Sequence, residues 1–163
     1  MKVLLRGFTL MEMMAVLAVI AILATLALPS YLEKIVRDQI KAALPLADIA
    51  KQPIAAAWAV EHSFPADNAA AGLPSADKIV ANHVGALAVK DGAIHITFGN
   101  RANKSLTGKI LTLRPAVVDD APIVPVAWVC GHAEAPDKMR VYGKNLTSVP
   151  EPLLPIECRA LKR

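Results

Sequence analysis

The feature that most constrains this chain is a long apolar run close to its N-terminus. No charged residue occurs from Met13 to Leu32, a run of 20 residues. The 21 residues from Phe8 to Leu28 contain one charge, that of Glu12. As an α-helix, such a run extends about 31 Å, the thickness of the hydrocarbon core of a bilayer. The run therefore predicts a membrane-spanning helix with a single carboxylate near its start.

Two common explanations of such a run leave part of the sequence unexplained. A cleaved secretory signal peptide has an apolar region of about 7–15 residues, followed by small residues at the cleavage site. Here the run is longer, and it continues past Pro29 into an amphipathic helical pattern. A plain signal anchor, held with its N-terminus inside by Lys2 and Arg6, explains the topology. It does not explain Glu12, because an unpaired carboxylate in hydrocarbon costs about 2.5–3.5 kcal/mol.

The stretch GFTLMEMMAVLAVIAILATLALPSY closely resembles the N-terminus of type IV pilins and of the pseudopilins of type II secretion. That pattern consists of a short basic leader ending in glycine, a cut before phenylalanine, a glutamate at the fifth mature residue, and a hydrophobic helix that closes on a proline. The matching positions here are Gly7, Phe8, Glu12 and Pro29. The resemblance implies that a prepilin peptidase cuts between Gly7 and Phe8 and methylates the new amino group of Phe8.

The resemblance also implies that Glu12 takes part in assembly. Cleavage creates a cationic amine at Phe8, one helical turn before Glu12. In a filament, Glu12 of one subunit would meet the Phe8 amine of a neighbour among apolar helices, where a paired carboxylate costs less than a lone one. We therefore expect Glu12 to set the register of assembly rather than to act as a catalytic base. Pilins often carry glycine where this chain has Ala21, so melting of the helix before Pro29 is less favoured here.

Beyond the apolar run, the pattern predicts a helix followed by a sheet. Apolar residues at helical spacing indicate an amphipathic helix that ends at residue 61, bent or locally broken by Pro45 and Pro53. Alternating residues then predict four strands, with Asp91-Gly92 as a strong hairpin signal. The predicted strands cover residues 84–89, 93–98, 109–113 and 124–130. The expected fold is α+β, with a long N-terminal helix, its first half transmembrane, packed on a four-stranded antiparallel sheet.

The order DGAIHITFGN, GKILTLRP, VAWVCG and LPIECR resembles the globular domain of type IVa pilins. In that family the cysteine of the last strand is joined to one near the C-terminus, which implies a disulfide between Cys130 and Cys158. These are the two cysteines of the chain. An export-type N-terminus also favours a disulfide over free thiols or a metal site. The enclosed residues are rich in glycine and proline, and tying them is worth about 3–4 kcal/mol in the chain-entropy model.

These patterns predict six segments along the chain. They are a leader at 1–7, a transmembrane and assembly helix at 8–31, an amphipathic helix at 32–61, a connecting αβ-loop at 62–83, an antiparallel β-meander at 84–130, and a disulfide-bounded loop and tail at 131–163.

The sequence gives no support for an enzyme, a cofactor or a metal site. Its four histidines lack metal-ligand spacing, and no nucleophile–base set or phosphate-binding glycine loop is present. The pair Asp119-Asp120 is more simply explained as a solvated loop than as a cation site. The net charge of +4 is mild. A late group of basic residues is more simply explained as solvated surface than as a nucleic-acid site, namely Lys138, Arg140, Lys144, Arg159, Lys162 and Arg163.

The resemblance implies a structural subunit of a type IV pilus, located in the inner membrane before assembly and in the extracellular pilus afterwards. Expected partners are further copies of the chain, other pilins, the prepilin peptidase and the inner-membrane assembly machinery. Family members use such filaments in adhesion, twitching motility or DNA uptake. Two alternatives stay open. One is a type II secretion pseudopilin, which a bound calcium and a missing disulfide would favour. The other is a minor pilin that binds DNA or a surface.

Overall fold

The computed structural model describes residues 7–160, and at 26–30 it describes the backbone alone. The predictions for the basic leader before Gly7, for the side chain of Pro29, and for Lys162 and Arg163 therefore lie outside the described residues. The chain divides into two compact units, the first ending at Ile35 and the second beginning at Val36.

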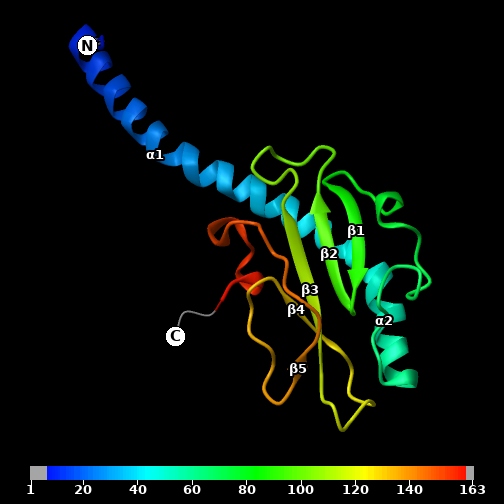
Figure 1. Cartoon of the computed structure of the whole chain (residues 1–163). Helices are drawn as coiled ribbons and strands as arrows, with labels where there is room; N and C mark the ends of the chain where they lie inside the picture. The colour runs from blue at the N-terminus through cyan, green and yellow to red at the C-terminus, as the bar shows by residue number, and fades with distance from the viewer. Residues whose placement is uncertain (1–6, 161–163) are drawn as a thin grey trace, which may run out of the picture. The chain divides into compact units, whose positions relative to one another are not determined.

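The first unit consists mainly of the N-terminal part of helix α1 (Leu10–Ala43), coloured blue in Figure 1. The helix is continuous through position 29, although proline lacks the N–H that a helix interior normally uses. Many large apolar side chains of this part are exposed, among them Leu10, Met11, Leu17, Ile22 and Leu23. Within the described residues, no helix is both long enough and apolar enough to cross a membrane.

Helical spacing continues through the start of the second unit, as predicted. The end of α1 passes through a 3-10 turn, η1 (Leu44–Ala47), into α2 (Asp48–Glu61). Pro45 lies in the first turn of η1 and Pro53 lies inside α2. The buried positions follow one stripe at intervals of three or four residues, namely Val36, Ile40, Ala43, Ala47, Ala50, Ile54 and Trp58. The α-helical pattern thus breaks locally at Pro45.

The stripe packs on one face of an antiparallel sheet. Its strands are β1 (Val84–Lys90), β2 (Ala93–Phe98), β3 (Ile110–Val117) and β4 (Ala127–Cys130), which lie side by side in that order (Figure 1). Asp91 and Gly92 form the β1–β2 turn, with φ values of 49° and 78°. A two-residue hairpin turn whose twist matches that of the flanking strands requires positive φ at both of its residues. The predicted α+β class and four-stranded meander are confirmed.

The sheet differs from the prediction at its third and fourth strands. Strand β3 continues to Val117 instead of ending at Leu113, β4 begins at Ala127 instead of Val124, and β5 (Arg140–Val141) pairs with the far end of β3. The N–H and C=O of a strand residue point to the same side. Since Pro115 O accepts from Tyr142 N, the donor that Pro115 lacks falls on the β5 side. The ladder with β4 is therefore intact, and proline does not end the strand.

The core lies between the helices and the sheet. Its largest fully buried side chains include Phe98, Ile40, Ile54, Leu87, Ile94, Ile96, Leu106, Leu111 and Leu154. Asn68, in the connecting αβ-loop, is buried and fully used: its amide donates to Pro74 O and Leu87 O, and its oxygen accepts from Val89 N. These bonds tie the loop to β1. Further 3-10 turns are η2 (Ala76–Lys78), η3 (Glu151–Leu153) and η4 (Ile156–Cys158).

Candidate functional site

The predicted cleavage point precedes the first helical residue. Gly7, Phe8 and Thr9 have no helical structure, and α1 begins at Leu10. Gly7 is exposed, and the side chain of Phe8 is 72% exposed. The Gly7–Phe8 peptide bond is therefore not held in helical hydrogen bonds.

Glu12 takes part in a capping box at the start of α1. Its backbone N–H donates to Thr9 Oγ1, while its Oε2 accepts from both the N–H and the hydroxyl of Thr9, each over 3.2 Å. This reciprocal pattern satisfies donors that a helix start otherwise leaves open, and the N-terminal end of a helix favours a negative charge. Our sequence analysis missed this role, which the Thr-x-x-Glu spacing ahead of an apolar run was sufficient to indicate.

The disulfide implied by the family resemblance is present between Cys130, the last residue of β4, and Cys158 in η4. The backbone beside it is tightly fitted. Gly131 has φ of 55°, and a Cβ there would come within 2.6 Å of Cys158 O. The N–H of His132 also donates to Cys158 O. Both the covalent bond and this close approach hold the C-terminal segment, residues 142–158, against the end of β4.

The same segment covers the sheet face that points away from the helices. The hydroxyl of Thr147 accepts from Thr112 N, and the hydroxyl of Thr112 accepts from Leu146 N. Beneath it, the Nδ1 of His95 lies 3.0 Å from Thr112 Oγ1, while its Nε2 is buried and has no hydrogen-bond partner among the described residues. Burial, with a smaller effect of the Lys90 charge, lowers the pKa of His95 below 6.5. A neutral His95 is therefore part of the fit between segment and sheet.

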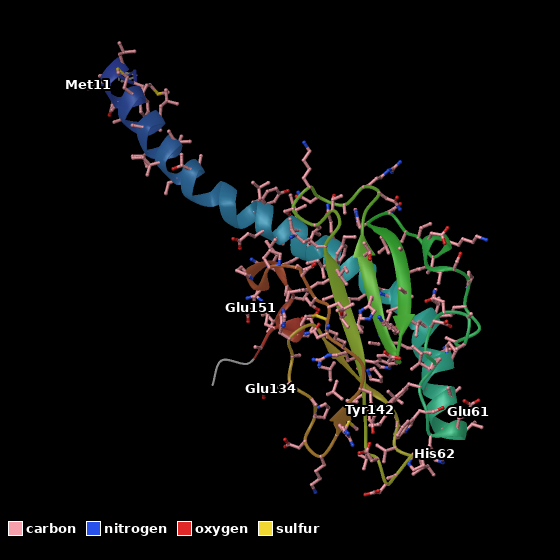
Figure 2. All side chains as sticks on the ribbon, viewed as in Figure 1. Met11, Glu61, His62, Glu134, Tyr142 and Glu151 are labelled. Atoms are coloured by element: carbon pink, nitrogen blue, oxygen red, sulfur yellow. A yellow bond between two sulfur atoms is a disulfide. The ribbon has the colours of Figure 1, made fainter. Side chains whose placement is uncertain are left out.

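Three aromatic side chains from distant parts of the chain meet beside the end of α2. Trp58 stacks on Phe64 with ring centroids 4.9 Å apart, and Tyr142 lies 5.8 Å from Trp58 and 5.2 Å from Phe64. Figure 2 labels Tyr142 and His62 at this end of the sheet. We call Trp58, Phe64 and Tyr142 the aromatic cluster. No local sequence signal links these positions, and the sequence analysis did not predict it.

Two charged side chains beside the cluster, Asp119 and Arg140, have partners within the domain. The hydroxyl of Tyr142 donates to Asp119 Oδ1 over 2.7 Å, and Arg140 Nη1 lies 3.4 Å from Asp119 Oδ2. The hydrogen bond to Asp119 raises the pKa of Tyr142 above its usual value, with burial adding to the effect.

Arg159 donates to Leu154 O and Pro152 O. Two members of the basic group therefore have structural partners. Among residues 7–160, no group of three acidic, histidine or cysteine side chains is placed to hold a metal.

Two family models match adjacent parts of the chain. The prokaryotic N-terminal methylation motif matches residues 6–28, which include Gly7, Phe8 and Glu12. The model described as pilin, a bacterial filament protein, matches residues 36–159, which hold the sheet and the disulfide.

Relatives of known name match along most of the chain. The type IV major pilin protein PilE of Neisseria gonorrhoeae is 34% identical over 133 residues, covering 81% of this chain and 77% of that protein. A fimbrial protein of Neisseria meningitidis serogroup B is 30% identical over 149 residues, covering 91% and 85%. The fimbrial protein EcpC of Eikenella corrodens is 35% identical over 133 residues, covering 80% and 84%.

Proposed function

The chain belongs to the pilin family of bacterial filament proteins, and on this premise we propose that it is the structural subunit of a type IV pilus. The observation that carries this function is the order of the two matches, a methylation motif at 6–28 followed by a pilin domain at 36–159. Relatives named major pilins and fimbrial proteins span both parts. The subunit polymerises through α1, and its β domain forms the outer surface.

Processing takes place at the Gly7–Phe8 bond. A prepilin peptidase cuts there and methylates the new amine of Phe8. The exposed, non-helical position of the bond supports this, because a protease needs an accessible and extended backbone. Before assembly, the apolar run keeps the precursor in the inner membrane. The filament is extracellular and serves adhesion, twitching motility or DNA uptake.

Assembly gives the carboxylate of Glu12 an additional, charged partner. In the isolated chain the carboxylate accepts two hydrogen bonds from Thr9, so it enters an apolar environment already paired with donors. In the filament, the methylated amine of Phe8 from a neighbouring subunit adds a charged partner. Since this amine carries a full positive charge, it adds a Coulomb attraction that the uncharged donors of Thr9 lack, and the carboxylate prefers the stagger that brings the amine to it. Exposed apolar side chains of α1 supply the remaining cohesion.

The two alternatives receive less support. The disulfide is present, whereas its absence would have favoured a secretion pseudopilin. The DNA-binding alternative relied on late basic residues, and Arg140 and Arg159 are engaged within the domain. The relatives reported above are named pilins and fimbrial proteins.

Mass spectrometry of sheared surface filaments tests the proposal. We expect an abundant mature chain that begins at methylated Phe8 and has lost Met1 to Gly7. A Glu12→Gln variant keeps the size of the side chain and one oxygen that accepts hydrogen bonds, but it removes the negative charge. We expect it to be cleaved normally and to leave the sheared fraction at least about ten-fold depleted of filaments.

Glu151→Gln is the matched control, because it makes the same chemical change at an exposed position of the β domain. It should assemble as the wild type does. Processed chain found only in the membrane fraction, together with normal filaments in the Glu12→Gln variant, would contradict the major-subunit role. That result would point to a minor pilin or a secretion pseudopilin.

A further inference from the structure

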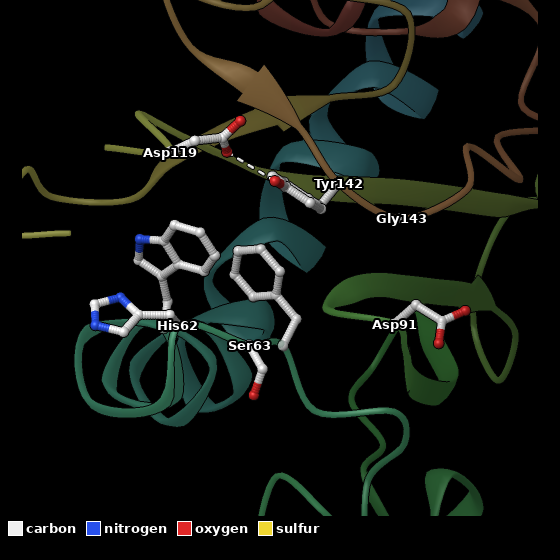
Figure 3. Close-up of a pocket in the computed structure, with 8 residues that line it drawn as sticks. His62, Ser63, Asp91, Asp119, Tyr142 and Gly143 are labelled. Carbon is white, nitrogen blue, oxygen red and sulfur yellow. Dashed lines mark hydrogen bonds between the residues drawn. The ribbon is translucent and has the colours of Figure 1, made fainter. Parts of the chain in front are cut away.

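A pocket lies beside the end of α2, apart from the residues used in the assembly proposed above. Its volume is about 410 Å³, within the range of roughly 300–1,000 Å³ common for small-molecule sites. Figure 3 shows it between the end of α2, the β1–β2 turn and the segment after β5. The residues that line it are Trp58, His62, Ser63, Phe64, Asp91, Asp119, Tyr142 and Gly143.

Aromatic rings form the inner wall of this pocket. Trp58 is 5% exposed and supports Phe64 by stacking, while Phe64 and Tyr142 are partly exposed. The centroids of these two rings lie 5.2 Å apart with their planes inclined by 52°. The face of an aromatic ring carries a negative quadrupole and attracts cations. Two inclined, partly exposed rings therefore offer a cation more than one favourable contact.

The acidic side chains at the rim of the pocket also favour a cation. The eight described residues that line it include two carboxylates and no lysine or arginine. Asp119 is occupied by Tyr142 and Arg140. The carboxylate of Asp91 makes no hydrogen bond or ion pair within the described part of the chain, and the residue is exposed at the turn. One acidic group at the rim of the pocket is thus not engaged by another side chain of the described residues.

A ring and a carboxylate already hold one cationic side chain of this chain, that of Arg140. The guanidinium carbon of Arg140 lies 5.3 Å from the centroid of the Tyr142 ring while its Nη1 contacts Asp119. Ring and carboxylate together hold a cation there, outside the residues that line the pocket. Phe64 and Asp91 both line the pocket, so a ring and a carboxylate are again available, and the lining includes no lysine or arginine to occupy them.

We propose that this pocket binds a quaternary ammonium group, as found in choline. Such a group is weakly hydrated and donates no hydrogen bond, so ring faces and one carboxylate are sufficient to hold it. A primary ammonium would need three acceptors, which the rings do not provide. Free choline and the choline headgroup of a lipid carry the same chemistry. The site is separate from α1, so its failure in a test leaves the pilus function untouched.

The test is a titration of the ¹⁵N-labelled full chain in uncharged maltoside micelles with choline chloride at constant ionic strength. The two tryptophans give separate indole N–H signals. Trp58 lines the pocket and Trp128 lies in β4, outside the lining residues. We expect a saturable shift of the Trp58 signal while the Trp128 signal stays fixed. The neutral isostere 3,3-dimethyl-1-butanol should bind at least about ten-fold more weakly, because it lacks the charge.

Variants and a second ligand complete the design. Asp91→Asn should weaken choline binding by about five-fold, whereas Asp120→Asn, a neighbouring exposed acid outside the pocket, should leave it unchanged. Phosphocholine separates the two sources: binding equal to that of choline indicates a headgroup, and weaker binding indicates free choline. No saturable shift of Trp58, or an equal response to the neutral alcohol, would overturn the proposal.

Discussion

Removing the disulfide tests how the C-terminal segment is held in place. Cys130 and Cys158 are separated by 28 positions and both are buried. In the chain-entropy model, closing a loop of this length lowers the entropy of the unfolded chain by about 12 cal/mol/K, or about 3.6 kcal/mol at 25 °C. In a unit of roughly 130 residues, that loss corresponds to a melting temperature lower by about 10–15 °C. We expect this decrease for the double variant Cys130→Ala/Cys158→Ala.

Urea unfolding of the full chain in uncharged micelles measures both the stability and its origin. If the bond acts on the unfolded state, its removal lets the unfolded chain expand, so the urea m-value should rise along with the loss of stability. Wild-type protein under reducing conditions is the control and should match the double variant. A change in melting temperature below about 3 °C would refute the loop-closure argument, since it would correspond to less than about 1 kcal/mol. A large loss with an unchanged m-value would assign the effect to lost native contacts instead.

Three further predictions follow from single side chains. Because burial lowers the pKa of His95, the unfolded chain binds a proton more readily than the folded chain does. The stabilising effect should therefore be full above pH 6.5 and decline as the pH falls below it. Urea titrations at several pH values should show that the free energy of unfolding of His95→Gln depends less on pH than that of the wild type. Thr9→Val removes the hydroxyl of the capping box and should speed amide hydrogen exchange of Glu12 by about five-fold, the equivalent of about 1 kcal/mol. The control Thr25→Val loses only a hydrogen bond to Ile22 O and should leave the exchange rate of Glu12 unchanged. Asn68→Ala should lower the free energy of unfolding by about 2–3 kcal/mol, because three hydrogen bonds, two of them buried and one partly buried, lose their partner. A loss below about 1 kcal/mol would contradict its role as the anchor of the αβ-loop.

The aromatic cluster and the disulfide act on opposite ends of the C-terminal segment. The disulfide fixes Cys158 at the end of β4, and Tyr142 fixes the beginning of the segment against Trp58 and Phe64. Between them, hydrogen bonds to β3 hold the segment across the sheet. A surface segment anchored at three points can present a fixed shape to neighbouring subunits or ligands, although its regular elements are the short 3-10 turns η3 and η4.

Local patterns in the sequence were sufficient for the N-terminal region and for most of the secondary structure. The methylation motif is contiguous, so its family resemblance could be recognised from neighbouring residues, and the roles it implies for Gly7, Phe8 and Glu12 are predictions. Helical spacing predicted an amphipathic helix up to residue 61, and Asp91-Gly92 predicted its hairpin, because both signals depend on residues a few positions apart. The capping box was also encoded locally, although the sequence analysis overlooked it.

Apart from the disulfide, which the family resemblance implied, contacts between distant residues were decided only by the tertiary structure. The continuation of β3 through Pro115 depends on which neighbour lies on the side of the missing donor, and that neighbour is 27 positions away at Tyr142. The burial of His95 depends on a segment that crosses the sheet some 50 positions later. The pocket, likewise, forms where rings from positions 58, 64 and 142 meet. Periodicity reports which face of an element is apolar, but not which distant segment covers it, because that choice is made by packing of the whole domain.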